Sequence, residues 1–265
     1  MSQTQGAPQI TGKMFLFEQP ELLNIEQHRE LGIDPAKKPF DFCSKIRAVP
    51  LTISEIPEAS KRYPVVFMSK EEPVPLAIVG FHDDNNLFVD DDGNWENYAY
   101  IPGYLRRYPF ALAGESGGGD RLAFVVDRAY EGVSTESSRK LFQNGELSDF
   151  AKQAMEFTRT YESDRRLTDQ LMKALKKYDI IQPQTAQYTP AGETEPRPFT
   201  QYFGIDEQKL TALSDQQFLE LRQMNIFGVI YSHIHSLANW RDMISRRMRR
   251  FKLSEREAIS GARPA

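Results

Sequence analysis

The sequence predicts an α+β protein, with an antiparallel sheet in the N-terminal half and helices packed against it from the C-terminal half. Runs rich in β-branched and aromatic residues, which are typical of strands, cluster between residues 63 and 127. Apolar residues at helical spacing dominate residues 148–248. Because the strands precede the helices instead of alternating with them, the order favours α+β over a parallel βαβ sheet.

Size and composition indicate a self-sufficient globular core. The chain has 265 residues, of which 40% are hydrophobic and 26% are charged. A chain of this length buries enough surface to fold without a metal or a disulfide. We expect a partly loose N-terminal extension over residues 1–45, a single domain over residues 46–252 and a polar tail over residues 253–265.

Charge and targeting signals narrow the compartment and the partners. The net charge of −4 argues against nucleic acid as a partner. A single cysteine, Cys43, excludes an intramolecular disulfide. The chain begins with no signal-peptide pattern, and no apolar run is long enough for a transmembrane segment. Cytoplasm is therefore the default location, and the cell surface would require a route without an N-terminal signal peptide.

The N-terminal elements follow from capping patterns and β-rich runs. Thr52 and Glu55 form a T-x-x-E pattern that starts a helix, and Pro57 fits only the first turn. Strands are predicted over residues 63–68, 74–80 and 86–89, and a buried strand over Leu122–Asp127. The acidic run at residues 90–94 is a turn.

The C-terminal elements follow from helical periodicity. Ser148 is a predicted N-cap, and Ser214 with Gln217 forms a capping box. The first apolar stripe consists of Phe150, Ala154, Phe157 and Tyr161, and the second of Leu167, Leu171, Ala174, Leu175 and Tyr178. Residues 182–203 contain four prolines, which indicates an extended connector or an edge strand.

The most distinctive stretch is residues 85–110, NNLFVDDDGNWENYAYIPGYLRRYPF, in which an acidic turn, a tryptophan and a tyrosine-rich segment lead to paired arginines. Other short motifs stand around it in a fixed order: Val49-Pro50-Leu51, residues 63–67, Gly80, Leu141-Phe142, Gly145-Glu146, Ser148 and residues 231–237. Together, over roughly residues 45–240, these features closely resemble the bacterial SapC family.

This resemblance implies a setting and not a reaction. The family is named after a surface-layer gene cluster, and relatives occur near genes for TonB-dependent receptors and for flavoproteins that resemble tryptophan halogenases. The resemblance therefore implies an accessory or interaction protein of the cell envelope or S-layer, with partners there or in nutrient uptake. It supplies no catalytic residues and no cofactor.

Within the signature stretch, a small-ligand site competes with a structural role. Arg106 and Arg107 could clamp a carboxylate or phosphate while an aromatic wall covers the ligand. The tyrosines of that wall would be Tyr98, Tyr100, Tyr104 and Tyr108. Trp95 is expected to be buried against a sheet and to anchor the segment. In the opposing interpretation the tyrosines fill the core and the arginines pair with the acidic turn.

Three other patterns resemble chemical motifs but do not fit them. His233 and His235 would share a face on a strand as metal ligands, with a third ligand such as His82, Asp83 or Asp84, or else an imidazole bonds to the backbone near the last helix. The turn at residues 90–94 lacks the Gly and Glu of a calcium loop. GESGG at residues 114–118 matches G-x-S-x-G without a strand–elbow–helix context. We therefore predict no metal site.

The last predicted helix is amphipathic and basic. Its arginines, expected to be exposed, are Arg246, Arg247, Arg249 and Arg250. Trp240, Ile244 and Met248 are expected to turn inward. The basic face could contact an anionic membrane, lipopolysaccharide or nucleic acid, or could stay solvated while the apolar face covers a core.

Three classes of function stay open. The first is the accessory or interaction protein of the envelope, and a third, weaker class is nucleic-acid binding through the basic helix. The second is a ligand-binding protein or enzyme whose pocket is lined by Trp95, Tyr104, Arg106, Arg107 and His233. Convergence of the arginines and His233 on one cavity would favour the second class, and a flat apolar patch the first.

Overall fold

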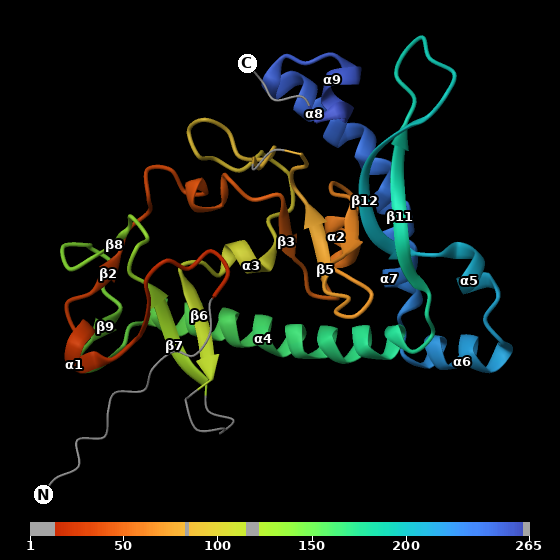
Figure 1. Ribbon diagram of the computed structural model, residues 1–265. Helices are drawn as coiled ribbons and strands as arrows, with labels where there is room; N and C mark the ends of the chain where they lie inside the picture. The colour runs from red at the N-terminus through yellow and green to blue at the C-terminus, as the bar shows by residue number, and fades with distance from the viewer. Residues whose placement is uncertain (1–13, 83–84, 115–121, 262–265) are drawn as a thin grey trace, which may run out of the picture. The chain divides into compact units, whose positions relative to one another are not determined.

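The computed structural model describes residues 14–82, 85–114 and 122–261 (Figure 1). Strands lie mostly in the N-terminal half and helices mostly in the C-terminal half, which confirms the predicted α+β class. Contacts divide the chain into unit 1, residues 1–42 with 106–163, and unit 2, residues 43–105 with 164–265. The boundaries expected at residues 45 and 252 stay predictions. No helix among the described residues combines the length and apolarity needed to cross a membrane.

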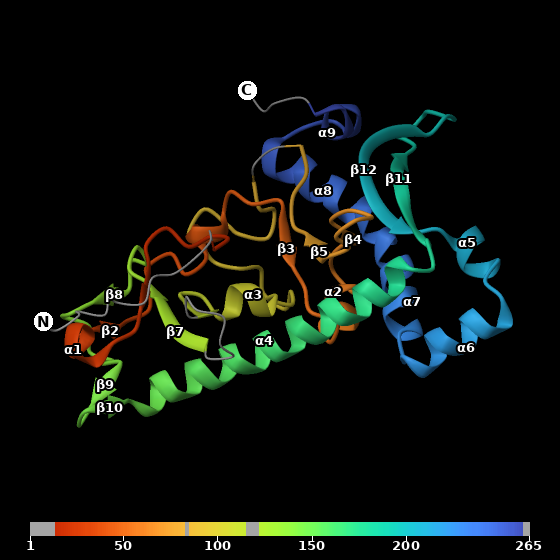
Figure 2. The same ribbon diagram turned by 60° about the horizontal axis from the view of Figure 1, so that its bottom comes forward.

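Unit 1 is built on a three-stranded antiparallel sheet in the order β1-β7-β6. The strands are β1 (Pro20–Leu22), β6 (Phe110–Gly114) and β7 (Leu122–Asp127), the last with its predicted bounds. The other elements are α1 (Ile25–His28), the pair β2 (Gly32–Ile33) and β8 (Val133–Ser134), and the pair β9 (Phe142–Gln143) and β10 (Glu146–Leu147). The β9–β10 pair leads directly into helix α4 (Asp149–Lys176), as Figure 2 shows.

Both faces of this sheet are covered, because successive side chains of a strand point to opposite sides. One face packs into a cluster that includes Phe110, Leu112, Phe124, Val126 and Ala151. The other face packs into a cluster of Phe17, Ala111, Ala113 and Val125. The start of β6, which follows the paired arginines, is therefore held by packing on both faces of the sheet.

Helix α4 is one continuous helix of 28 residues that carries both predicted apolar stripes. Ser148 caps it, since its hydroxyl accepts the backbone N–H of Ala151 at 3.2 Å, which confirms the predicted N-cap. Both predicted stripes therefore belong to one helix. Residues 162–166 between them contain no glycine or proline, so nothing ends the helix there.

Unit 2 contains a five-stranded antiparallel sheet in the order β11-β12-β4-β5-β3. Its strands are β3 (Ala48–Pro50), β4 (Val65–Phe67), β5 (Pro75–Ile78), β11 (Ile181–Tyr188) and β12 (Arg197–Ile205). The proline-rich run is a hairpin of which β11 forms the sheet edge, as expected. The same expectation is incomplete for β12, which lies inside the sheet between β11 and β4.

Helices supply the rest of unit 2. They are α2 (Ile56–Ala59), α5 (Glu207–Thr211), α6 (Asp215–Gln223), α7 (Phe227–Ser236), the 3-10 helix η2 (Leu237–Asn239), α8 (Trp240–Phe251) and α9 (Glu255–Ser260). The short η1 (Asp41–Cys43) and α3 (Gly103–Arg106) fall where the chain passes from one unit to the other. Helix α7 packs against α2, β4 and β12. The predicted box of Ser214 and Gln217 caps α6.

The strand predicted at residues 86–89 is wrong. Only Val89 pairs, through a single bridge to Trp95. Asn86 turns the chain instead: its side-chain oxygen accepts the N–H of Phe88 at 3.0 Å, and its amide donates to the carbonyl of Cys43 at 3.2 Å. Asparagine side chains compete with ladder hydrogen bonds in this way.

Candidate functional site

The acidic turn before Trp95 is held together by its first residue. The Asp90 carboxylate accepts the backbone N–H groups of Asn94 at 2.8 Å and Asp92 at 3.0 Å. The bond from Asn94 is the main cause that holds the pKa of Asp90 below its usual range. The carboxylate thus serves the turn itself. Across the described part of the chain, no group of His, Cys, Asp and Glu could hold a metal ion.

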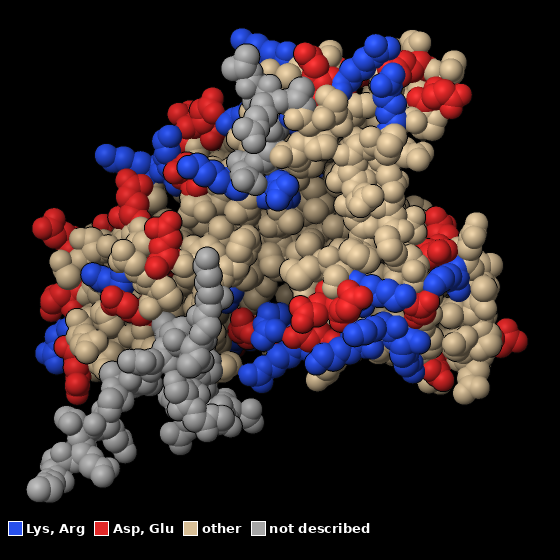
Figure 3. All heavy atoms as spheres, viewed as in Figure 1, with Lys and Arg blue, Asp and Glu red and all other residues tan. Residues whose placement is uncertain are grey.

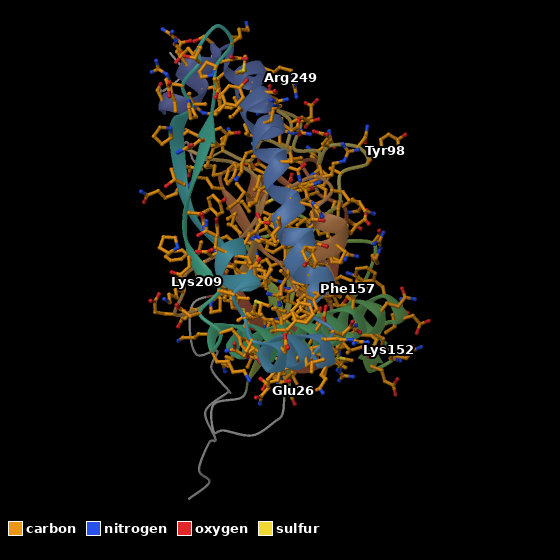
Figure 4. The ribbon with its side chains drawn as sticks, turned by 90° about the vertical axis from the view of Figure 1, so that its right-hand side faces the viewer. Glu26, Tyr98, Lys152, Phe157, Lys209 and Arg249 are labelled. Carbon is orange, nitrogen blue, oxygen red and sulfur yellow. The ribbon has the colours of Figure 1, made fainter. Side chains whose placement is uncertain are left out.

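The aromatic residues of the signature differ in exposure. Trp95 is 6% exposed and stacks on Phe88 with ring centroids 6.0 Å apart, which confirms its predicted burial. Tyr104 is also buried, at 8% exposure. Tyr98 is 96% exposed and projects into solvent (Figure 4). Trp95 and Tyr104 are thus part of the buried core of unit 2, and a ligand pocket lined by them stays a prediction.

Glu55 ties the signature to the predicted helix start. One carboxylate oxygen accepts the Thr52 N–H at 2.8 Å and the Thr52 hydroxyl at 2.9 Å. The other accepts the Tyr100 hydroxyl at 2.8 Å and the backbone N–H of Gly103. The T-x-x-E pattern therefore closes a turn just ahead of α2, which begins at Ile56, and anchors the loop that leads to α3.

Arg107 is buried in unit 1, where its side chain packs against helix α4. Its guanidinium carbon lies 4.8 Å from the ring centroid of Tyr161, and its Nη1 donates to Glu162 Oε1 at 3.3 Å. Arg107 therefore pairs with a carboxylate of α4, and the expected pairing with the acidic turn is wrong for this residue. The acidic turn instead pairs through Asp91 with Arg250, at 2.6 Å.

Tyr108 is fixed by a buried carboxylate. Its hydroxyl donates to Asp127 Oδ2 at 3.0 Å, and its ring stacks on Phe42 with centroids 4.0 Å apart. Burial, followed by the charge of Asp127, raises the pKa of the Tyr108 hydroxyl far above its usual range. Asp127 also accepts the backbone N–H groups of Glu18 and Gln19, at 3.0 and 2.8 Å. The Tyr108 hydroxyl is thus protonated at neutral pH, and its hydrogen bond and stacking fix the position of the ring.

Three arginines of unit 1 each lie over an aromatic ring of α4. The pairs are Arg139 over Phe150, Arg106 over Phe157 and Arg107 over Tyr161, with guanidinium carbons 4.8, 5.1 and 4.8 Å from the ring centroids. These rings belong to the first predicted apolar stripe, which therefore serves as a platform as well as a core face. Stacking orients a guanidinium, whose N–H groups point outward from its edge in the plane of the group.

The same arginines line a cleft of about 260 Å³, here called the arginine cleft. Its aromatic walls are Tyr108, Phe110, Tyr130, Phe150 and Phe157. Asp34 is the one carboxylate among its described lining residues. It accepts the hydroxyl and backbone N–H of Ser138 at 2.8 and 3.1 Å, and these bonds lower its pKa, with a smaller contribution from Arg139. The lining therefore carries an excess of positive charge.

This geometry is suited to a small anion. Arginine forks match carboxylate and phosphate oxygens, and the surrounding rings exclude water from one side of the ligand. The volume lies just below the range of about 300–1,000 Å³ for drug-sized ligands, so the cleft fits a compact molecule. It gathers Arg106, Arg107 and Tyr108 of the predicted set.

His233 belongs to a different environment in unit 2. It lies on helix α7, fully buried, where its Nδ1 donates to the Val65 carbonyl at 2.7 Å and its Nε2 accepts the Ile205 N–H at 3.0 Å. Burial lowers the pKa of His233 to about 4, so the ring is neutral at pH 7. His235 is exposed, because residues two apart do not share a helix face. Both ring nitrogens of His233 are thus bonded to the backbone, as in the backbone-bonded alternative, and a ligand pocket that includes His233 stays a prediction.

The basic helix α8 uses two of its arginines internally. Arg247 is fully buried and donates to the carbonyls of Glu257 and Ala258 at 3.1 and 2.9 Å, where the last turn of α9 has no intrahelical partners. Arg246 is 9% exposed and pairs with Glu96 and Asp242. Their expected exposure is wrong, because both lie on the side of the helix that carries Met243 and Ile244.

The other two arginines of α8 are exposed, and Figure 4 shows Arg249 pointing outward. Trp240 and Ile244 are buried as predicted. Two of the sequence hypotheses fall outside the described residues: the serine of GESGG, and the ligand candidates Asp83 and Asp84. The sequence predicted Arg106, Arg107 and Tyr108 of the arginine cleft but not Arg139 and Asp34, for which the aromatic stripe of α4 was the only signal.

Comparison with known proteins gives one result. Neither the curated proteins nor the solved structures include a match to this chain. The model of one protein family, SapC, matches residues 23–243. That span includes most of both units, the arginine cleft and the signature stretch. The chain therefore belongs to the SapC family.

Proposed function

We propose that this SapC-family protein binds a small organic anion, a carboxylate or phosphate, in the arginine cleft, and does so as an accessory protein of the cell envelope or S-layer with a role in nutrient uptake. One observation carries the binding proposal: three guanidinium groups, each stacked on a ring of α4, line a single cleft that holds one carboxylate. Charge-assisted bonds to arginine are among the stronger hydrogen bonds in proteins.

Electrostatics support an anion over a cation or a neutral ligand. Asp34 is committed to Ser138, and Glu162 contacts Arg107 from the helix side. Among the described residues, no carboxylate lies within ion-pair distance of the Arg139 guanidinium. A bound anion would neutralise part of this charge and gain bidentate contacts.

Calorimetric titration of the full chain with inorganic phosphate and with succinate tests the binding. The matched variants are Arg106→Gln, Arg139→Gln and Lys152→Gln, because Lys152 is an exposed cation of α4 outside the cleft. The two arginine variants should each weaken binding by about tenfold or more, which is about 1.4 kcal/mol. Lys152→Gln should change it by less than about twofold.

The same titration can overturn the proposal. Absence of heat with both anions at millimolar concentration and low salt would do so, as would equal losses in Lys152→Gln and Arg139→Gln. Phosphate binding without succinate binding, or the reverse, identifies which oxyanion the cleft prefers. A neutral control such as glycerol should give no saturable signal.

The envelope role rests on the family and on the exposed part of α8. Arg249 and Arg250 remain available at the helix surface, although Arg250 also pairs with Asp91. Peripheral contact of this kind is screened within about 8 Å at physiological salt. Cell fractionation should therefore find protein in the envelope pellet that high salt releases. The double variant Arg249→Ser/Arg250→Ser should reduce that fraction, and protein wholly in the supernatant would contradict the proposal.

A further inference from the structure

A second hollow lies on the sheet of unit 2, here called the sheet groove, with a volume of about 410 Å³. Strand β5 directs Ala77 into the core and turns Leu76 and Ile78 toward the groove, as the period of two requires. Met68, which is 50% exposed, adds to the same wall. Figure 3 shows the surface between β5 and β12 as an uncharged hollow.

The groove exists because β12 and β4 separate. They pair only at Phe203 and Phe67. On one side of this pair the His233 ring bridges the two strands, and on the other side Thr200 and Tyr202 of β12 line the groove. The sheet residues that line the groove are thereby left facing an open, largely apolar space.

Trp240 lines this groove and carries a buried hydrogen-bond donor. Its ring is 8% exposed and lies 6.3 Å from Phe81 and 6.0 Å from Tyr202, centroid to centroid. Within the described residues, its indole N–H has no hydrogen-bond partner. A buried donor without an acceptor costs about 1–3 kcal/mol, and an acceptor on a bound molecule would recover part of that cost.

The charge of the lining specifies the acceptor. No Asp or Glu is among the described residues that line the groove, whereas Arg47 is. Among the described lining residues, a ligand with one carboxylate would therefore meet the guanidinium of Arg47 and the indole donor of Trp240. The volume falls within the range for small-molecule sites, about 300–1,000 Å³.

We propose that the sheet groove is a second ligand site, independent of the arginine cleft, and that it takes an apolar monocarboxylic acid such as a medium-chain fatty acid. The apolar part of the acid covers Leu76, Ile78 and Met68. Its carboxylate accepts hydrogen bonds from Arg47 and from the indole of Trp240. The two sites thus differ in ligand: a compact anion in unit 1 and an apolar acid in unit 2.

Nuclear magnetic resonance of the full chain with ¹⁵N-labelled tryptophan tests this proposal. The chain has two tryptophans, so two indole signals are expected, and Trp95→Phe assigns them. Decanoate, added below its micelle concentration, should shift the Trp240 signal and leave the Trp95 signal unchanged. Calorimetry should give one decanoate per chain, with decan-1-ol binding more weakly because it lacks the charge.

Three variants distinguish binding in the sheet groove from nonspecific binding to exposed apolar surface. Arg47→Gln removes the cation and Leu76→Asp places a negative charge in the wall, and each should weaken decanoate binding by about tenfold or more. Phe218→Ser changes a 46% exposed apolar residue of α6 outside the groove and should alter binding by less than about twofold.

Several results would overturn the proposal. One is the absence of any Trp240 shift with millimolar decanoate. Another is binding of several decanoates per chain that Phe218→Ser reduces as much as Leu76→Asp does. Equal affinity for decan-1-ol and decanoate would remove the carboxylate from the inference, as would unchanged binding in Arg47→Gln.

Discussion

Glu55 and Asp127 show how a single buried carboxylate can organise a loop. Each accepts four hydrogen bonds, Glu55 in unit 2 and Asp127 in unit 1. In both cases the donors come from segments far apart in sequence. The carboxylate is fully hydrogen-bonded, which removes most of the cost of burying its charge. The loops that carry Tyr100 and Tyr108 are thereby held in single conformations.

Replacing Glu55 should therefore be costly. Glu55→Gln should lower the free energy of unfolding by about 1.5–3 kcal/mol, the range for hydrogen bonds to a charged group, since the amide cannot accept at both ends. Urea unfolding measures the change. The control is Glu58→Gln, an exposed carboxylate three residues along, which should stay within about 0.5 kcal/mol of the wild type. Equal effects of the two substitutions would contradict this role for Glu55.

His233 makes the stability of the protein depend on pH. Its pKa is about 4 in the folded chain and about 6.5 when unfolded, so the unfolded state binds more protons between those values. Stability should fall as the pH drops from about 6.5 to about 4, by an amount on the order of 3 kcal/mol.

A comparison of variants isolates this term. Unfolding measured across that pH range should show a flatter profile for His233→Gln, which can still donate to Val65 and accept from Ile205 but does not titrate. His235→Gln, at an exposed position of the same helix, should keep the wild-type slope. If the profiles of all three proteins ran parallel, another group would be responsible.

At the scale of the element, helix α4 combines two tasks on one stripe. Phe150 packs against the core of unit 1, and the rings of Phe150 and Phe157 lie under the guanidinium groups of Arg139 and Arg106. A cation over an aromatic ring is worth about 0.5–2 kcal/mol, depending on solvent exposure. Under the proposed function, the ring would position the arginine and the arginine would contact the anion.

Phe157→Leu tests this division of labour. The substitution keeps an apolar side chain and removes the ring, so the affinity for phosphate or succinate should fall by about two- to fivefold while binding persists. Gln153→Ala, on the exposed side of the same helix, serves as the control in the calorimetric titration. A loss as complete as that of Arg106→Gln would mean that Phe157 contacts the ligand itself.

Helix α9 depends on an arginine of α8. Arg247→Gln should lower the free energy of unfolding by about 1.5–3 kcal/mol, because it removes a charged donor from two carbonyls of α9. Hydrogen exchange should locate the effect in residues 255–260. Arg249 lies two residues after Arg247 and is exposed, so Arg249→Gln should leave both the free energy of unfolding and the exchange of α9 unchanged. Rapid exchange of α9 in the wild type would show that Arg247 does not hold it.

At the scale of the whole molecule, the two units share one interleaved chain. Unit 1 takes residues 1–42 and 106–163, and unit 2 takes the segments between and after them. The sheet of unit 1 needs β1 from the first segment and β6 and β7 from the second. The sheet of unit 2 likewise combines β3–β5 with β11 and β12.

Cutting the chain at residue 105 should therefore leave neither unit complete. Residues 106–265 produced alone should give a poorly dispersed NMR spectrum without cooperative unfolding, because both sheets lack strands. Co-production with residues 1–105 should restore dispersion, which controls for damage by the cut itself. A cooperative fold of residues 106–265 alone would contradict this account.

The sequence predicts local order well where the signal repeats. The stripe from Phe150 to Tyr161 and the capping serines Ser148 and Ser214 specify helices, because each pattern depends on residues within one or two turns. The strand at Leu122–Asp127 has the same advantage, since both of its faces are apolar. The predicted strand at residues 86–89 failed because one side chain, Asn86, offered the backbone a local alternative.

Nonlocal pairings had no comparable signal. Arg139 stands in an ordinary polar run, and only the folded chain brings it to Phe150, beside Arg106 and Arg107. His233 bridges two strands that are far apart in sequence, and no motif announces such a contact. Arg247 was predicted to be exposed because it is charged, although its helical spacing places it on the buried side of α8.

The two tryptophans are distributed unevenly between the units, so intrinsic fluorescence does not report equally on both. Trp95 and Trp240 both belong to unit 2, so indole emission reports on that unit, and unit 1 is represented only by tyrosine. An acid that binds in the sheet groove would change the emission of Trp240, which lines the groove. An anion entering the arginine cleft would be silent in the same experiment, although Tyr108 and Tyr130 stand in its walls. A screen that relied on tryptophan emission alone would find one class of ligand and overlook the other.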